Sequence, residues 1–260
     1  MKIGFLGAGH LGGAIIKGLL ASKKYQQEDF HIVVGSDSSM AAYQKENFKV
    51  SKDWATLADC EVVLLALRPD DISKNKEQLS AIFSKQQIII SVAAGVNLQQ
   101  LQAIFPNASV SRAMPNTSCQ FNQSMTMIAQ EGKPEANQTA QEIFNLLGKT
   151  IVLPEEKIHV FIAICGSASA YLYYWLQPLM QMALDSKISL ADSKSIITEL
   201  LVGVAANIQH SSDSLAELQK QVSVPGGTTI EAISVFDQHN LKQVVSEAIA
   251  AVAKRSQELA

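Results

Sequence analysis

Residues 2–12 read KIGFLGAGHLG, and this segment gives the clearest indication of the fold. An apolar run at residues 2–6 is typical of a β-strand, a helix begins at about Leu11, and the pattern Gly-x-Gly-x-x-Gly lies between them. Its glycines permit a tight turn, close approach of a pyrophosphate, and close packing of helix on strand. The helix N-terminus adds unpaired N–H groups that attract negative charge. We therefore expect a dinucleotide to bind Gly7, Ala8, Gly9, His10, Leu11 and Gly12.

Short apolar runs alternate with amphipathic stretches through the first 155 residues. Candidate strands follow the first one at residues 31–34, 61–66, 88–92, around 110, 124–129 and 150–153. This rhythm of repeated βα units is typical of a doubly wound, largely parallel α/β sheet. Pro154-Glu155-Glu156 reads as the exit from this domain. We predict a dinucleotide-binding Rossmann-type domain at residues 1–155.

After residue 155 the pattern becomes helical. No further strand signal occurs, and apolar residues recur at helical spacing through Ile158, Ile162, Tyr171, Trp175, Leu179 and Met182. Ser189-x-x-Asp192 resembles a capping box, and residues 241–259 read as a last amphipathic helix. So small a domain cannot bury all of these apolar faces. We predict an all-helical domain at residues 156–260 that binds substrate and forms a homodimer or a larger homo-oligomer.

The composition excludes several classes of partner. The 260 residues are 47% hydrophobic and 17% charged with a net charge of -3, so the chain should fold compactly and lacks the basic surface that nucleic acid needs. The three cysteines and five histidines show no disulfide or metal-ligand spacing. No signal sequence and no apolar run of membrane-spanning length is evident. We expect a cytoplasmic protein that binds a small molecule, without metal, nucleic acid or membrane.

The turn Gly35-Ser36-Asp37-Ser38 should face the adenosine ribose of the dinucleotide. Ser36 fits the 2′-phosphate of NADP, whereas Asp37 would repel that phosphate and fits the free hydroxyl of NAD. Asp37 is about equally well explained as a cap of the next helix. The choice between the two cofactors therefore stays open at this point.

Three further segments end predicted strands: LALRP at residues 65–69, SVAAGV at 91–96 and RAMPNT at 112–117. The carboxyl ends of parallel strands line the ligand crevice of an open sheet, although each segment alone is explained by ordinary turn chemistry. With VPGGTT at residues 224–229, they make the chain similar to the pyrroline-5-carboxylate reductase family. The resemblance spans residues 1–255.

The resemblance implies a reaction and a set of site residues. Members of this family transfer a hydride from NADP(H), or from NAD(H), to the cyclic imine 1-pyrroline-5-carboxylate and form L-proline. The glycine turn, with Ser36 and Asp37, is one part of the expected cofactor site. The resemblance implies further cofactor contacts at Ala66, Leu67, Arg68, Pro69, Ala93, Ala94, Met114, Pro115, Asn116 and Thr117. The substrate carboxylate is expected on Pro225, Gly226, Gly227, Thr228 and Thr229. The Thr229 hydroxyl is the candidate catalytic group, hydrogen-bonded to the ring nitrogen.

The PGGTT loop suits an anion because a glycine pair before a helix exposes N–H groups. Taken alone, it is better explained as an N-cap in which Thr228 or Thr229 satisfies its own helix; the co-occurring RAMPNT segment reverses that preference.

Several positions depart from the family pattern. Arg68 replaces a usual Lys, Ala168-Ser169 replaces Gly-Pro, Val224 replaces a Ser, and Ser186-Lys187 replaces two small residues. Most of these lie in the helical domain, so substrate identity is less firmly implied than dinucleotide binding. One alternative is a reductase of another imine or of a β-hydroxy acid, although the latter should carry a catalytic Lys that residues 158–184 lack. Another is a dinucleotide-sensing homologue without turnover.

Overall fold

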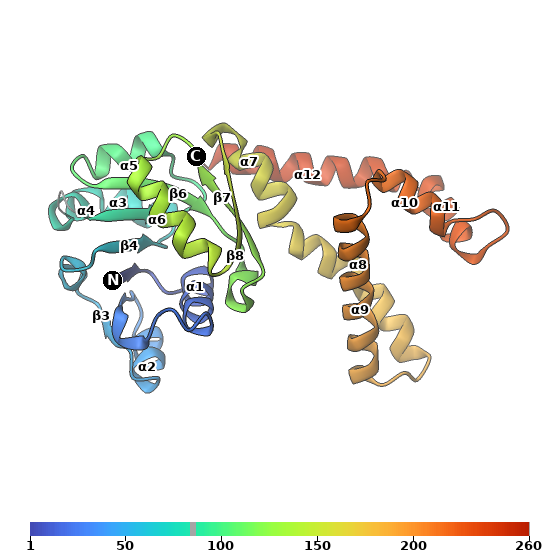
Figure 1. Cartoon of the computed structure of the whole chain (residues 1–260), viewed down its shortest axis with the longest axis horizontal. Helices are drawn as coiled ribbons and strands as arrows, with labels where there is room; N and C mark the ends of the chain where they lie inside the picture. Colours follow the sequence, from blue (N-terminus) through green and yellow to red (C-terminus); the bar gives the residue numbers. More distant parts are fainter. Residues whose placement is uncertain (84–86, 260) are drawn as a thin grey trace. The chain divides into compact units, whose positions relative to one another are not determined.

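A computed structural model describes residues 1–83 and 87–259 of the chain (Figure 1). The described residues form an eight-stranded sheet in the order β3-β2-β1-β4-β5-β6-β7-β8, parallel throughout except between β6 and β7. The strands are β1 (Ile3–Leu6), β2 (Phe30–Val33), β3 (Lys49–Ser51), β4 (Val62–Leu65), β5 (Ile88–Ser91), β6 (Ser109–Met114), β7 (Ser124–Ala129) and β8 (Gly148–Leu153). The predicted doubly wound fold is confirmed, since β3-β2-β1-β4-β5-β6 is the Rossmann order.

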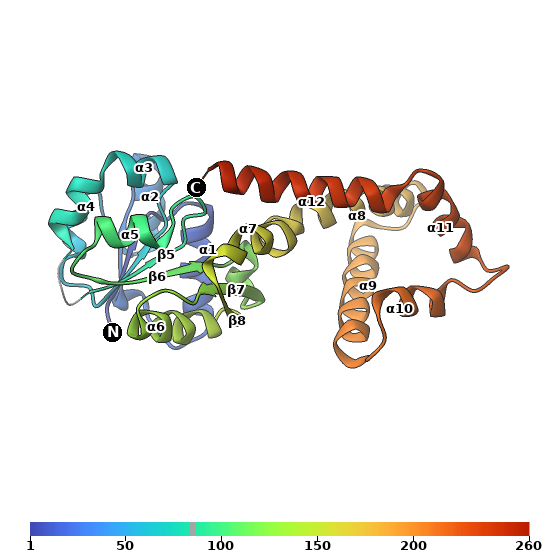
Figure 2. The ribbon, with the colours of Figure 1, turned by 90° about the horizontal axis from the view of Figure 1, so that it is seen from above.

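Helices cover both faces of the sheet (Figure 2). They are α1 (His10–Ala21), α2 (Asp37–Lys45), α3 (Pro69–Lys74), α4 (Lys76–Ile82), α5 (Leu98–Ile104) and α6 (Pro134–Asn145). One apolar core joins Phe5 and Phe30 of the sheet to α1 and α6, and a second joins the opposite face to α3, α4 and α5. Burial of β4 on both faces explains its uninterrupted Val-Val-Leu-Leu sequence.

The sequence did not reveal β3. This edge strand contains only Lys49, Val50 and Ser51, and Lys49 is exposed while the other two are half-buried, so it has no apolar run. It pairs in parallel with β2, placing Ser51 opposite Val33. The position just after β3 therefore lies at the same edge of the sheet as the turn after β2.

The remaining helices are α7 (Ile158–Phe161), α8 (Ala168–Asp185), α9 (Leu190–His210), α10 (Leu215–Val222), α11 (Thr228–Gln238) and α12 (Leu241–Glu258), with a π-helical turn at Ile162–Gly166. Ser189 caps α9 by accepting the Asp192 N–H at 3.1 Å. Contacts divide the described chain into one unit of residues 1–167 and 252 onward, and a helical unit of residues 168–251. The boundary at 155/156 remains a prediction, and residue 260 lies outside the described residues.

One expectation about the helices is wrong. Glu155–Asp185 is helical throughout its 31 residues and, by length and composition, apolar enough to cross a membrane. The chain was expected to contain no apolar run of that length. Gly166 and Pro178, which interrupt helical patterns in a sequence, lie inside this helical segment. Length and composition do not separate a membrane span from an apolar helix that another protein surface covers.

Candidate active site

The candidate phosphate-binding turn joins β1 to α1. Gly7 has a φ of 96°, which favours glycine, and a Cβ there would lie 2.6 Å from the Ala66 carbonyl oxygen. Gly9 is the N-cap of α1, whose first N–H groups therefore have no side-chain acceptor. A Cβ on Gly9 would meet no atom of the described residues within 4 Å. The turn combines open space with backbone donors, which is what a pyrophosphate requires.

A cleft of about 580 Å³ opens beside this turn. The carboxyl ends of β2 and β4 complete its lining, as expected for a ligand site in an open α/β sheet. Of the predicted cofactor residues, the cleft brings together Gly7, Ala8, Gly9, His10, Leu11, Gly12, Ser36, Ala66, Leu67 and Arg68. It also includes Gly35, from the turn that was expected to face the ribose, and Val34, Ser39 and Asp71, which the motifs did not single out. Pro69 begins α3 directly after Arg68.

A second pocket of about 580 Å³ shares Gly9 and His10 with the cleft. The predicted cofactor residue Thr117 lines it, together with Tyr43 of α2. The Tyr43 hydroxyl donates to the Ala8 carbonyl oxygen at 3.2 Å, and burial raises the pKa of Tyr43, so it stays protonated and supports the turn. The contact spans 35 positions along the chain, which explains why no local pattern indicated it.

The turn after β2 places Ser36 and Asp37 at the N-terminus of α2. The Ser36 hydroxyl caps this helix by accepting the Ser39 N–H at 3.1 Å, so the alternative that Asp37 is the cap is wrong. The Asp37 carboxylate instead lies 2.6 Å from the Lys52 ammonium group. Lys52 was not among the predicted site residues because it follows the unrecognised strand β3.

A buried arginine connects the loops where the nicotinamide half is expected. Arg112 of β6 is 1% exposed and donates at 2.7 Å both to the carbonyl oxygen of the exposed Ala94 and to the Glu155 carboxylate. Glu155 also accepts the Leu98 N–H at 2.8 Å. Arg112 thus fixes the loop after β5, where Ala93 is buried, against the segment that follows β8. The RAMPNT motif contains Arg112 but did not indicate this role, because both acceptors lie far away in the sequence.

Strand β6 ends at Met114, and Pro115 and Asn116 follow it. The Met114 side chain packs against Ile158 and Phe161 and thus belongs to the core. Asn116 caps the short helical turn Thr117–Phe121 by accepting the Ser118 N–H at 3.0 Å, and its amide donates to Cys165 Sγ at 3.6 Å. Burial raises the pKa of the Cys165 thiol, which keeps it protonated. None of these contacts tests the expected approach of Asn116 to the nicotinamide.

In the PGGTT segment of the helical unit, Pro225, Gly226 and Gly227 connect α10 to α11, and Thr228 and Thr229 begin α11. Gly226 has a φ of 76°, and Gly227 is the N-cap of α11. Thr228 and Thr229 are exposed on the first turn, and no side chain caps the helix. The reading that a threonine hydroxyl caps its own helix is therefore wrong. The loop instead presents backbone N–H groups and two hydroxyls at one helix end.

Comparison with known proteins identifies the family. A pyrroline-5-carboxylate reductase from Synechocystis is 30% identical over 265 aligned positions, covering 100% of this chain and 98% of the relative. The chain belongs to the pyrroline-5-carboxylate reductase family. The Escherichia coli pyrroline-5-carboxylate reductase is 28% identical, with 99% of this chain and 98% of that protein covered. The predicted family is thus confirmed over the whole length of the chain.

Two family models each match one part of the chain. Residues 2–95 match a model described as NADP oxidoreductase coenzyme F420-dependent, and residues 155–259 match one described as pyrroline-5-carboxylate reductase dimerisation. Among solved structures, the Streptococcus pyogenes 1-pyrroline-5-carboxylate reductase superposes with a TM-score of 0.85 at 28% identity, covering 99% of this chain and 98% of that one. A Plasmodium falciparum pyrroline carboxylate reductase with NADP bound gives 0.88 at 21% identity, covering 100% and 98%, and supports the fold.

Proposed function

We propose that this chain is a pyrroline-5-carboxylate reductase that reduces the cyclic imine 1-pyrroline-5-carboxylate to L-proline with NADPH. The observation that carries the proposal is the open phosphate-binding turn at Gly9, set in the cleft between β1, β2 and β4, in a chain related to these reductases over its full length. Two alternatives are a reductase that acts on another imine and a homologue without turnover, and kinetic measurements distinguish them from the proposed function.

The residues of the cleft suit a dinucleotide. Gly9 leaves the space that a pyrophosphate would fill, and α1 supplies backbone donors at its N-terminus. Three segments lie at the edge where the nicotinamide half is expected: residues 66–69 after β4, the turn around Ala93 and Ala94 after β5, and residues 114–117, which begin with the last residue of β6. When bound, the dinucleotide supplies the hydride. The chain's own contribution is to hold the reactants in position and to exclude water.

The loop Pro225–Thr229 is the proposed site for the substrate carboxylate. Backbone N–H groups after Gly226 and the N-terminus of α11 favour an anion, and the exposed Thr228 hydroxyl adds a donor. The Thr229 hydroxyl hydrogen-bonds the ring nitrogen. A protonated imine accepts a hydride readily, so no buried acid–base pair is required.

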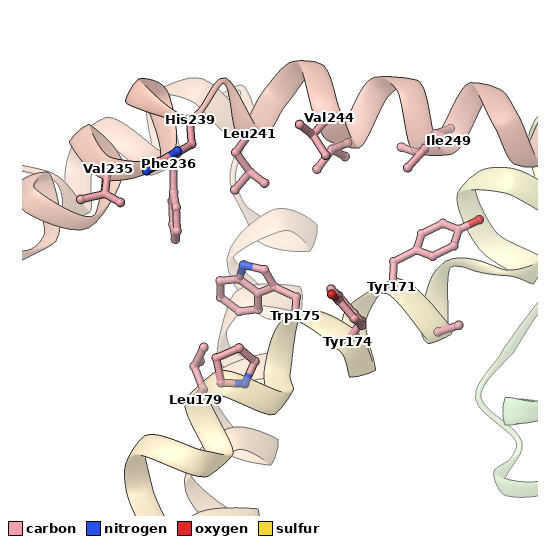
Figure 3. Close-up of a pocket in the computed structure, with 14 residues that line it drawn as sticks. Tyr171, Tyr174, Trp175, Leu179, Val235, Phe236, His239, Leu241, Val244 and Ile249 are labelled. Atoms are coloured by element: carbon pink, nitrogen blue, oxygen red, sulfur yellow. The ribbon is translucent and has the colours of Figure 1, made fainter.

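The helical unit is proposed to form a homodimer, or a larger assembly built on dimers. Among residues 168–251, all of which the structure describes, only Leu176, Ser193 and Ser223 are buried. An apolar groove of about 700 Å³ runs between α8, α11 and α12 (Figure 3). Trp175 and Leu179 of α8 face Phe236 of α11 and Leu241 of α12 across it. A second copy would cover these side chains, which also accounts for the apolar helix Glu155–Asp185 in a cytoplasmic protein.

The proposal is tested by steady-state kinetics with 1-pyrroline-5-carboxylate, following the loss of NADPH absorbance in wild type and in Thr229→Val. Removing the hydroxyl should lower kcat by about 10- to 100-fold, the range for one lost hydrogen bond to a charged group. Thr139→Val, a matched change on α6, should leave kcat unchanged. Absence of turnover in wild-type protein that binds NADPH would contradict the proposed reaction, and turnover of another imine would reassign the substrate.

A further inference from the structure

The side chain of Lys52 reaches the turn where the adenosine ribose is expected. Strand β3 pairs with β2 in parallel register, Ser51 lies opposite Val33, and the Val34 N–H donates to the Ser51 carbonyl oxygen at 3.1 Å. Lys52 therefore follows its strand at the sheet edge where Ser36 follows β2. Its ammonium group lies 2.6 Å from the Asp37 carboxylate in the first turn of α2.

This ion pair changes the electrostatics of the turn. A lone Asp37 would repel a 2′-phosphate and would bond a 2′-hydroxyl. With the Lys52 ammonium beside it, the two formal charges cancel. The partial positive charge at the N-terminus of α2 remains, and it favours an anion.

Three hydroxyl groups stand at the same helix end. The Ser36 hydroxyl lies 3.1 Å from that of Ser38 and 2.9 Å from that of Ser39. Ser36 and Ser39 also line the cleft that contains the phosphate-binding turn. The Ser36 and Ser39 hydroxyls are therefore part of the proposed cofactor site and can rotate to donate to a phosphate.

The Lys52–Asp37 pair is accessible to a ligand. The Lys52 side chain is 46% exposed and that of Asp37 is 93% exposed. An ion pair this exposed to solvent contributes little to folding stability. The fold therefore does not require the ammonium group to stay at this position. It can share its donors with a phosphate while Asp37 turns toward solvent.

We propose that Lys52 recognises the 2′-phosphate of the dinucleotide and makes this chain select NADPH over NADH, although Asp37 occupies the position typical of NAD-binding proteins. The inference rests on the proposed function only in that the cleft binds a dinucleotide. It assigns the specificity to a residue outside the motifs, and it settles the choice that the Ser36-Asp37 sequence leaves open.

Binding of adenosine phosphates tests the inference without turnover. Calorimetry would compare 2′,5′-ADP, which carries the 2′-phosphate, with 5′-AMP, which lacks it. Wild type should bind 2′,5′-ADP more tightly. Lys52→Gln should weaken 2′,5′-ADP binding by about 10- to 100-fold and change 5′-AMP binding little, because a charged partner of the phosphate is lost and Asp37 is left uncancelled.

Two further variants complete the experiment. Lys49→Gln removes the same charge at the amino end of β3, so its affinity for both nucleotides should equal that of wild type. Asp37→Asn removes the repulsive carboxylate and should tighten 2′,5′-ADP binding. Equal losses for both nucleotides in Lys52→Gln, no loss for either, or tighter binding of 5′-AMP by wild type would overturn the inference. Because these ligands contain neither nicotinamide nor imine, the result is independent of whether the chain reduces pyrroline-5-carboxylate.

Discussion

Gly7 and Gly9 belong to one motif but are glycines for different reasons. Gly7 adopts a left-handed φ of 96° and a Cβ there would collide with the Ala66 carbonyl oxygen, whereas Gly9 faces open space. The first residue is therefore constrained by the fold of the protein itself, and the second, in the proposed site, by the pyrophosphate that would fill this space.

Alanine at each position should separate these two constraints. Gly7→Ala should lower the free energy of unfolding by at least about 1–2 kcal/mol, the cost of a left-handed conformation for an L-residue. Gly9→Ala should cost less than about 1 kcal/mol of stability, yet weaken NADPH binding markedly, because its methyl group occupies the pyrophosphate space. Urea denaturation and fluorescence titration with NADPH measure the two effects. Undiminished NADPH affinity in Gly9→Ala would contradict the assignment of the turn.

Site residues that belong to a local sequence motif were predictable. Site residues that act through contacts with distant parts of the chain were not. The glycine spacing and the place of Ser36 after β2 pointed to residues that line one cleft in the structure. Tyr43 and Lys52 were missed because each acts on a residue 15 or more positions away, through contacts that only the folded chain creates.

At the scale of elements, Arg112 and Glu155 join β6, the loop after β5 and the segment after β8. Each hydrogen bond is charge-assisted, and Arg112 is almost fully buried, so removal of the guanidinium would leave the Glu155 carboxylate without its cation. The network therefore holds the expected nicotinamide loops against the rest of the sheet unit.

Arg112→Ala should lower the free energy of unfolding by about 3–5 kcal/mol, as found when one partner of a buried ion pair is removed. Arg255→Ala is the control, since Arg255 pairs with Glu258 on the exposed surface of α12, and its loss should cost less than about 1 kcal/mol. Both are measured by urea denaturation at one protein concentration. Similar small losses in the two variants would show that the Arg112 network does not hold the loops.

Strands were predictable from the sequence where they contain a run of apolar residues. Strands β4 and β5 were predictable because both of their faces are covered, which requires a continuous run of apolar residues. Strand β3 has only one half-buried apolar residue and therefore no apolar run that would indicate a strand. The PGGTT loop shows the same limit. Taken alone, the loop sequence favoured a threonine cap at α11, but the N-cap is Gly227, the residue before Thr228.

At the scale of the whole molecule, the two units differ in what buries their apolar residues. The sheet unit has two cores of its own, whereas the helical unit leaves Tyr174 78% and Val244 54% exposed. The excess of apolar helix faces was predictable from the sequence. The helical spacing from Ile158 to Met182 was predictable as well, but the membrane-spanning length of the apolar segment Glu155–Asp185 was not recognised.

A charge in the groove should therefore dissociate the assembly. Trp175→Asp places a carboxylate among apolar side chains of α11 and α12 and should yield monomers, while wild type forms dimers or larger species. Phe121→Asp, the same kind of change at an exposed aromatic residue of the sheet unit, should leave the size unchanged. Size-exclusion chromatography with light scattering measures the mass. A monomeric wild type would contradict the proposed dimer.

Hydride transfer from NADPH to the imine carbon of 1-pyrroline-5-carboxylate can be followed with an isotope label. The protein would be incubated with 1-pyrroline-5-carboxylate and NADPH deuterated at nicotinamide C4 on the transferred face, and the product analysed by mass spectrometry. The account predicts proline that carries one deuterium on the former imine carbon. Unlabelled proline, or no proline from protein that binds NADPH, would contradict it.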